Sequence, residues 1–169
     1  MSSRLTVVAV VTDKRMRQWS VALQANRRSG CQTAEFGVWP VGRVAASSRP
    51  IGSACCIVDK SGDAKLEDFT IDPPYQNTGI GSALLAEVET WAVRAGIGRL
   101  YGDLARVDSA HFTMLRHLYT KHGWKWCVFC EGDPRLRPTS HVVGVVEKAI
   151  VVEESEHGRA DTGLEGDDY

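Results

Sequence analysis

Short runs of apolar residues in the first half of the chain are typical of β-strands. Residues 5–11 form a Val-rich run, and residues 34–42 and 51–58 form two similar runs, the last followed by an Asp-Lys-Ser-Gly turn signal. Residues 65–71, of mixed polar and apolar character, form another predicted strand, which stops at Asp72 and two prolines. The pattern therefore predicts four strands before residue 72.

Residues 14–28 carry a different spacing. Met16, Trp19 and Leu23 stand three and four positions apart, as on one face of a helix, and Asp13 can cap the start of that helix. We therefore expect a helix after the first strand.

The second half of the chain predicts helices that alternate with strands. The clearest helix has one apolar stripe with steps of three and four, formed by Ile80, Leu84, Val88, Trp91 and Ala95. A strand at residues 99–104 leads to a second helix, which Asp108 or Ser109 can cap. Two further strands are predicted at residues 124–130 and 141–150.

This order predicts one domain over residues 1–152. A meander of early strands followed by strands that alternate with helices indicates an α/β chain of the mixed α+β kind. Residues 153–169 contain seven acidic residues, one arginine and almost no large apolar group, which predicts a disordered acidic tail. The tail has a net charge of −6 and the whole chain a net charge of −1, so the domain itself is mildly basic. A mildly basic domain suits a small polyanionic ligand. Its Lys and Arg residues are scattered, so nucleic acid is not favoured as a partner.

The location of the protein is predicted from two absences in the sequence. No apolar run approaches the roughly 18–20 residues that span a bilayer, so no membrane association is expected. The five cysteines are odd in number, and no secretion signal accompanies them, which favours reduced thiols and a cytoplasmic protein. Cys127 and Cys130 form a lone C-x-x-C pair among aromatic residues, which indicates a structural role rather than a metal site.

The segment between residues 66 and 82 has the most specific pattern in the chain. A predicted strand, a Pro-Pro-Tyr turn and a glycine-containing loop lead directly into the clearest helix. Gly79 and Gly81, at alternate positions, let successive backbone N–H groups point into one hollow. The first turn of the helix adds unpaired N–H groups and the positive end of the helix dipole. The segment therefore predicts a binding site for phosphate groups.

Two common phosphate loops do not fit these residues. The nucleotide-triphosphatase loop requires a Gly-Lys pair followed by Ser or Thr, and the chain has no Gly-Lys pair. The dinucleotide fingerprint requires a third glycine three residues after the second, where this chain has Leu84.

The loop resembles that of the GCN5-related N-acetyltransferases, the GNAT family. Their signature is Gln or Arg, two residues, Gly, one residue, then Gly or Ala, which Gln76, Gly79 and Gly81 match. Tyr119, four residues before Gly123 at the end of the next helix, also matches the family, and the resemblance covers residues 51–124. It implies a GNAT-like domain with a central mixed, mostly antiparallel sheet of about six or seven strands flanked by helices. It also implies an enzyme that transfers an acetyl group from acetyl-CoA to a primary amine of a small molecule or protein by direct attack.

The resemblance implies which residues hold the donor. Backbone groups of the strand would align the pantetheine arm, and N–H groups of the loop and first helical turn would hold the pyrophosphate. These residues are Phe69, Thr70, Ile71, Gln76, Asn77, Thr78, Gly79, Ile80, Gly81 and Ser82.

Acetyl transfer to an amine requires an acid and a base. The resemblance makes Tyr119 the general acid, and a phenol with a pKa near 10 is a suitable donor to a thiolate because it is protonated at neutral pH. The base is open: Glu67 comes first, then Asp103, then Asp68, and a proton relay through water is an equal alternative. Glu67 is expected to share a strand face with Phe69.

Two departures from the family pattern keep a second hypothesis open. Asn77 stands where the family usually has a basic residue, and Phe112 stands where it often has Asn. The alternative is a module of the same fold that binds CoA or a partner with weak or no catalysis. His111, His117 and His122 lack the adjacent-turn spacing of metal ligands, so surface or capping roles and no metal site are expected.

The sequence leaves the acceptor and the oligomeric state open. We expect acceptor specificity to come from the predicted first helix and the loops at residues 43–50 and 133–138. The Trp-rich late strands could pair across a homodimer.

Overall fold

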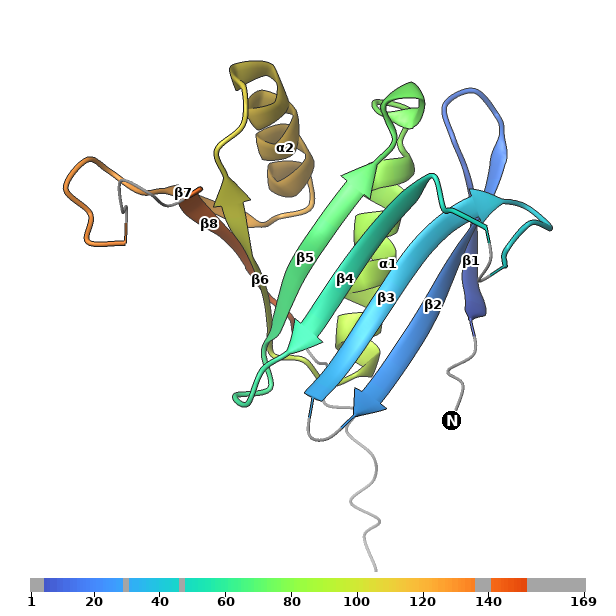
Figure 1. The fold of residues 1–169 in the computed structure, drawn as a ribbon, viewed down its shortest axis with the longest axis horizontal. Helices are drawn as coiled ribbons and strands as arrows, with labels where there is room; N and C mark the ends of the chain where they lie inside the picture. The colour runs from blue at the N-terminus through green and yellow to red at the C-terminus, as the bar shows by residue number, and fades with distance from the viewer. Residues whose placement is uncertain (1–4, 29–30, 46–47, 136–140, 152–169) are drawn as a thin grey trace, which may run out of the picture.

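The computed structural model of the chain describes residues 5–28, 31–45, 48–135 and 141–151. These residues form eight β-strands, two α-helices and one short 3-10 helix (Figure 1). In chain order the elements are β1 (Thr6–Thr12), β2 (Gln18–Arg28), β3 (Cys31–Pro40), β4 (Gly52–Val58), β5 (Ala64–Ile71), η1 (Pro73–Tyr75), α1 (Ile80–Arg94), β6 (Arg99–Ala105), α2 (Ser109–Lys121), β7 (Lys125–Val128) and β8 (Val142–Ala149). The predicted tail lies outside the described residues, so the boundary at residue 152 stays a prediction.

The eight described strands form one sheet in the order β1-β2-β3-β4-β5-β6-β8-β7. All neighbours are antiparallel except β5 and β6, which form the parallel pair. The prediction of a mixed, mostly antiparallel sheet is confirmed, with one or two strands more than expected.

α1 covers one face of the strands from β1 to β5, behind the sheet in Figure 1. Most of its predicted stripe is buried against that face: Ile80, Leu84, Val88 and Trp91. Trp91 meets Phe36 of β3 edge to face, with ring centroids 6.0 Å apart. Ala95 lies at the C-cap and is exposed. α2 packs against β7, on the other side of the β5–β6 junction.

β2 occupies most of the segment predicted to be a helix, so that prediction is wrong. Trp19 and Val21 are buried, and Leu23 packs against the core, so these residues alternate with period two. Their spacing with Met16 also fits a helix, but β2 pairs with β1 over residues 18–23 and with β3 over residues 19–28. Pairing on both edges overrides the weak local preference. The expectation that a first helix sets acceptor specificity is therefore wrong as well.

Asp13 closes the β1–β2 turn instead of capping a helix. Its carboxylate accepts hydrogen bonds from the N–H groups of Arg15 at 2.8 Å and Arg17 at 2.9 Å. It also accepts from the Arg17 side chain at 2.8 Å and from the Trp19 indole at 3.1 Å. Met16, at the tip, has a φ of 60° and is 82% exposed.

β5 and β6 are paired at one end and part at the other. Ala64 pairs with Leu100 and Lys65 with Tyr101, and beyond these residues the two strands diverge (Figure 1). The two strands are therefore not paired with each other at the carboxyl end of β5.

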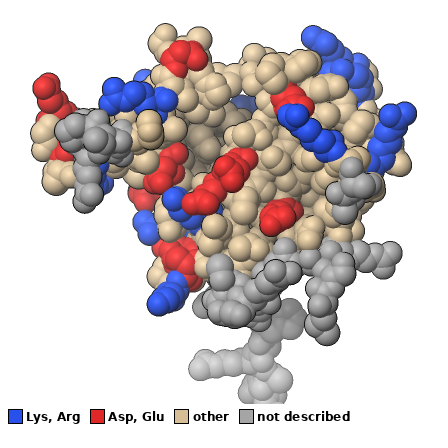
Figure 2. Space-filling view, in the orientation of Figure 1, with Lys and Arg blue, Asp and Glu red and all other residues tan. Residues whose placement is uncertain are grey.

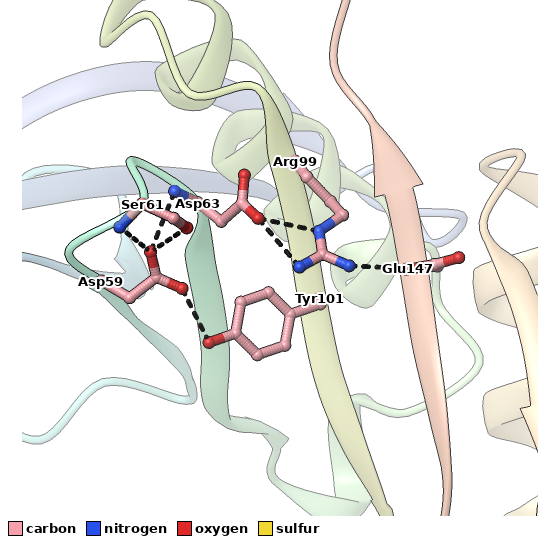
Figure 3. Close-up of polar contacts among 6 residues, drawn as sticks. All are labelled: Asp59, Ser61, Asp63, Arg99, Tyr101 and Glu147. Carbon is pink, nitrogen blue, oxygen red and sulfur yellow. Dashed lines mark hydrogen bonds and ion pairs between the residues drawn. The ribbon is translucent and has the colours of Figure 1, made fainter.

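The paired end of β5 and β6 is tied by a polar network (Figure 3). Arg99 of β6 donates to Asp63 at 2.9 Å and to Glu147 of β8 at 3.2 Å. The Tyr101 hydroxyl donates to Asp59 at 3.1 Å. Exposed ion pairs contribute little individually, but here they join three elements at the point from which the strands diverge.

Candidate active site

Two residues with left-handed backbone shape the loop after η1. Asn77 has a φ of 59° and Gly79 a φ of 97°. Glycine adopts this conformation freely, and Asn adopts it more readily than most other residues. Gly79 is the N-cap of α1 and offers no side-chain oxygen to the first helical turn. Asn77 therefore suits the backbone at a position where the family resemblance leads us to expect a basic residue.

Three hydrogen bonds hold the outer side of this loop. Gln76, the first residue of the signature, donates through Nε2 to the Ile71 carbonyl at 2.9 Å. The Thr78 hydroxyl donates to the Tyr75 carbonyl at 2.6 Å. The Thr78 carbonyl accepts from the N–H of Lys14, in the β1–β2 turn, at 2.8 Å. The loop is thus held at Gln76 and at Thr78.

The inner side of the loop presents unpaired donors. None of the backbone N–H groups of residues 77–82 has an acceptor among the described residues. At a helix N-terminus such groups attract anions, and the helix dipole adds to the attraction. A Cβ added to Gly81 would contact only Ile71 at 3.6 Å and Leu118 at 4.0 Å, so the space above the loop is open. The loop therefore fits a ligand that bears phosphate groups.

A cleft of about 350 Å³ opens over the loop, between the end of β5 and α2. Eight of the ten predicted donor residues line it: Phe69, Thr70, Ile71, Gln76, Asn77, Gly79, Gly81 and Ser82. Thr78 and Ile80 are buried instead, and their side chains support the loop from below.

Sequence reasoning missed the opposite wall of this cleft. It is lined by Lys14 of the β1–β2 turn and by His111, Met114, Leu115, His117, Leu118 and Lys121 of α2. The α2 residues recur at helical spacing, so the sequence contains a signal for one shared face, whereas nothing near Lys14 indicates its contact with the loop. Lys14 and Lys121 provide positive charge at a site whose loop has Asn77.

β5 contains a bulge between the predicted base and the donor residues. Asp68 and Phe69 stand opposite the single residue Ala54 of β4, and Asp68 has a φ of 50°. A bulge shifts the alternation of side chains by one position. Leu66 before the bulge and Phe69 after it both pack toward the core, so Glu67 lies on the other face. The expectation that Glu67 and Phe69 share a face is therefore wrong.

Glu67 and Asp103, the two leading candidate bases, share one lysine. Lys65 Nζ lies 3.0 Å from Glu67 Oε1 and 2.9 Å from Asp103 Oδ2. Hydrogen bonds to Asp103 and to Glu67 raise the pKa of Lys65, so the lysine is charged and holds both carboxylates near each other. The structure thus brings together two residues that are 36 positions apart in the sequence.

Tyr119 is buried at the base of the site. It is 7% exposed, does not line the cleft, and packs against Phe69, Trp124 and Trp126. Burial, with a smaller effect from Cys56, raises the pKa of Tyr119 to about 12. Its hydroxyl forms no hydrogen bond with the described residues. Among these residues, only Arg17 has a side-chain N or O atom that is both fully buried and without a hydrogen-bond partner. The Tyr119 oxygen therefore retains some contact with solvent.

Phe112 of α2 also packs rather than facing the donor cleft. Its ring meets that of Trp126 edge to face, with centroids 5.0 Å apart. The residue that replaces the family's Asn therefore attaches α2 to β7.

A second hollow, of about 420 Å³, lies on the sheet face that α1 leaves uncovered. Trp39 of β3 forms part of its lining, and its ring lies directly over Gly37, where a Cβ would clash. The Trp39 indole donates to the Ser48 carbonyl at 3.0 Å, which fixes the ring against the loop after β3. Part of the predicted acceptor loop at residues 43–50 therefore borders this hollow, whereas residues 136–138 of the other loop lie outside the described residues.

Acidic side chains border this second hollow. Glu35 and Asp68 line it, and neither forms an ion pair or hydrogen bond with another described residue. Cys55 pairs with Glu35 of β3 and with Glu67 of β5. Burial raises the pKa of the Cys55 thiol, and Glu35, Glu67 and Asp68 raise it further. Figure 2 shows acidic side chains over the middle of this face.

Comparison with known proteins identifies the family. The model of the acetyltransferase (GNAT) family matches residues 10–124. The chain belongs to the GNAT acetyltransferase family. The matched residues contain the donor loop, α1, the parting strands and α2. This GNAT protein is therefore an acyl-CoA-dependent N-acetyltransferase, and acetyl-CoA is its acyl donor. The unpaired N–H groups of residues 77–82 and the open space at Gly81 fit that donor.

Solved structures of GNAT proteins share the fold. An acetyltransferase from Streptococcus pneumoniae is 22% identical with a TM-score of 0.52, over 70% of this chain and 67% of that chain. The ribosomal-protein-S18-alanine N-acetyltransferase from Escherichia coli is 19% identical with a TM-score of 0.51, over 72% of each chain. An acetyltransferase from Staphylococcus aureus is 17% identical with a TM-score of 0.51, over 70% of this chain and 68% of that chain. No protein of curated function matches the chain.

Among the described residues, no group of three or more His, Cys, Asp or Glu side chains is arranged to hold a metal ion. Neither of the two described α-helices is long and apolar enough to cross a membrane.

Proposed function

We propose that this acetyltransferase acetylates a primary amine that reaches the donor from the uncovered face of the sheet. The observation that carries the proposal is the bulge in β5. Phe69 lines the donor cleft, whereas the preceding residue, Asp68, lines the acidic hollow. Consecutive residues of one strand thus border both spaces, so an amine beside Asp68 would be near the end of a donor that lies along residues 69–71.

The acidic border of the hollow supports an amine as acceptor. Glu35 and Asp68 have no partner among the described residues, and a cationic ligand would supply one. Opposite charges in a shallow hollow attract a ligand and orient it, although solvent screens each interaction.

The donor supplies an activated acetyl group as a thioester, and residues of this chain handle the protons. We propose that Glu67 or Asp103, directly or through water, removes one proton from the acceptor ammonium. The neutral amine nitrogen then forms a bond to the acetyl carbon, and the carbon–sulfur bond breaks. Tyr119 gives its proton to the departing sulfur and regains one from the acylated nitrogen. The products are an amide, a thiol and one proton released to solvent.

The surroundings of Tyr119 support its role as the acid. With a pKa raised to about 12, its hydroxyl keeps its proton across the physiological pH range. Its ring lies against Phe69, with centroids 6.4 Å apart, and Phe69 lines the donor cleft. The hydroxyl has no competing hydrogen bond within the described structure.

A panel of amines tests the proposed function. Purified protein would be mixed with acetyl-CoA and with monoamines, diamines, amino acids and peptides, and thiol release and acetylated product would be measured together. We expect acetylated amine in proportion to thiol. Thiol release without amide, or neither product with any amine, would count against amine acetylation and would favour a module that binds CoA without turnover.

Tyr119→Phe separates catalysis from packing. General acid catalysis typically contributes about 10²–10⁴-fold, so we expect kcat to fall at least about 100-fold while the Kd of CoA stays the same. Tyr101→Phe is the matched control, because it removes a tyrosine hydroxyl that contacts Asp59 at the closed end of the sheet. Wild-type turnover in Tyr119→Phe would show that Tyr119 only packs.

A further inference from the structure

Ser82 and His122 connect the donor cleft to a partly buried charge network. Ser82, in the first turn of α1, lines the cleft, and its Oγ lies 2.6 Å from His122 Nε2 at the C-cap of α2. On the other side of the imidazole ring, His122 Nδ1 lies 3.6 Å from Glu89 Oε1. Glu89 also accepts from Lys148 Nζ at 2.8 Å and from the Trp124 indole at 2.7 Å. The two helices that border the cleft are therefore joined through one imidazole.

The position of the proton on His122 decides what Ser82 can offer a ligand. Glu89 favours a proton on Nδ1, so a neutral ring accepts at Nε2 and takes the single hydroxyl proton of Ser82. Ser82 then presents only lone pairs to the cleft, which repel a phosphate oxygen. A protonated ring donates from Nε2 to Ser82 Oγ, and the hydroxyl proton is free to donate into the cleft.

We propose that His122 is a positioning residue for the donor, which takes up a proton when acetyl-CoA binds and thereby turns the Ser82 hydroxyl toward a phosphate group. The inference rests on the donor site alone and is independent of the amine acceptor. It explains why a half-buried histidine is held between a carboxylate and a hydroxyl that faces the cleft.

The charges around His122 set the direction of the effect. Burial lowers the pKa of His122 below 6.5, Glu89 of α1 opposes this, and Lys148 of β8 and the neighbouring Lys121 lower it further. The free protein therefore holds a neutral ring at pH 7 and above. A bound polyanion raises the pKa of the ring, so binding consumes protons and tightens as the pH falls toward the pKa of the free protein.

Calorimetric titration with coenzyme A tests the coupling. Titrations between pH 5.5 and 8, in buffers with different ionisation enthalpies, give both the Kd and the number of protons taken up. We expect the wild type to take up protons when it binds coenzyme A. Between pH 8 and pH 5.5 its Kd should fall roughly tenfold more than the Kd of variants that lack the coupling. Titration of the ligand's own phosphates is common to all variants and cancels in that comparison.

Two variants remove opposite ends of the contact. His122→Gln removes the titrating ring, and Ser82→Ala removes the hydroxyl while leaving His122 in place. Alanine is a good helix former, so Ser82→Ala also carries the test if His122→Gln lowers the melting temperature. Each variant should lose the same excess proton uptake, and the double variant should lose no more than either one. His141→Gln, which removes a histidine that does not line the cleft, should behave as wild type.

Three results would overturn the inference. The first is that the wild type takes up no more protons on binding than the variants do. The second is that either variant takes up as many protons as the wild type. Amine acetylation by a protein that behaves in one of these ways would leave the proposed function intact. The third is failure to bind coenzyme A at all, which would overturn the donor-site assignment as well.

Discussion

The two hollows on either side of the β5 bulge present different kinds of chemical group to a ligand. The donor cleft presents backbone N–H groups of residues 77–82, and its shape depends on Gly79, Gly81 and the left-handed Asn77. The acidic hollow is lined by residues of four strands, of the loop after β3 and of the segment before β1, spread between residues 5 and 68. Backbone recognition requires few residue types in a fixed order and therefore appears in the sequence as a motif. Side-chain recognition across strands leaves no local pattern, so its ligand is not readable from the sequence.

The largest effect is expected at Gly81, where a substitution should abolish binding through the backbone of the donor loop. Gly81→Glu places a carboxylate between Ile71 and Leu118 and beside the unpaired N–H groups, so coenzyme A binding should fall more than about 100-fold by calorimetry. Gly81→Ala is the control, because its Cβ meets both neighbours at ordinary contact distance and should leave the Kd within about twofold. Equal affinity in the two variants would refute the placement of the phosphate groups at this loop.

The acceptor side should respond to smaller changes, because its charges are exposed. Replacing Glu35 by Gln and Asp68 by Asn together should raise the KM of a diamine up to roughly tenfold, with kcat and the Kd of coenzyme A unchanged. The effect should shrink in high salt. Glu87→Gln, on the α1 side of the sheet, is the matched control. If the KM of diamines and of neutral-tailed monoamines changes equally, the hollow does not orient the acceptor by charge.

Local sequence signals predicted the parts of this fold that depend on local physics. Most of the predicted α1 stripe is buried, and Asp108 caps α2 by accepting from the His111 N–H at 2.9 Å. Gly123 ends α2 with a φ of 74°. Each of these features follows from residues within one or two helical turns, where spacing and capping chemistry are visible in the sequence.

The errors have a common physical origin in pairing between distant residues. The spacing of Trp19 and Leu23 fits the period of a helix as well as that of a strand, and only the pairing of β2 with β1 and β3 selects the strand. The bulge at Asp68 arises from register with β4, so the face of Glu67 could not be derived from strand alternation. The contact between Ser82 and His122 likewise joins residues 40 positions apart. The loop of the proposed donor site was predictable because its backbone supplies the N–H groups, whereas the residues proposed to handle protons depend on tertiary register.

The smallest effect is expected at Asp13, which supports the donor loop from the β1–β2 turn. Burial acts to raise the pKa of Asp13, but hydrogen bonds from the Arg17 N–H, the Trp19 indole, the Arg17 side chain and the Arg15 N–H outweigh it and lower the pKa to about 2. A carboxyl whose pKa is lower in the folded state stabilises the fold above its unfolded pKa, near 4, and this contribution is lost as the pH falls toward 2. The wild type should therefore melt at a higher temperature than Asp13→Asn at pH 6, and the difference should narrow between pH 4 and pH 2.

The same variant should separate the two ligand sites. The neighbouring Lys14 N–H holds the Thr78 carbonyl at 2.8 Å, so a looser turn should relax the donor loop and weaken coenzyme A binding by about two- to fivefold. The acidic hollow shares no residue with the turn, so the KM of an amine measured at saturating donor should not change. Glu131→Gln, an exposed acid outside both hollows, controls for the loss of one charge. An equal change in donor Kd and amine KM would show that the turn supports the whole sheet. A difference in melting temperature that is constant from pH 6 to pH 2 would show that ionisation of Asp13 does not cause the difference.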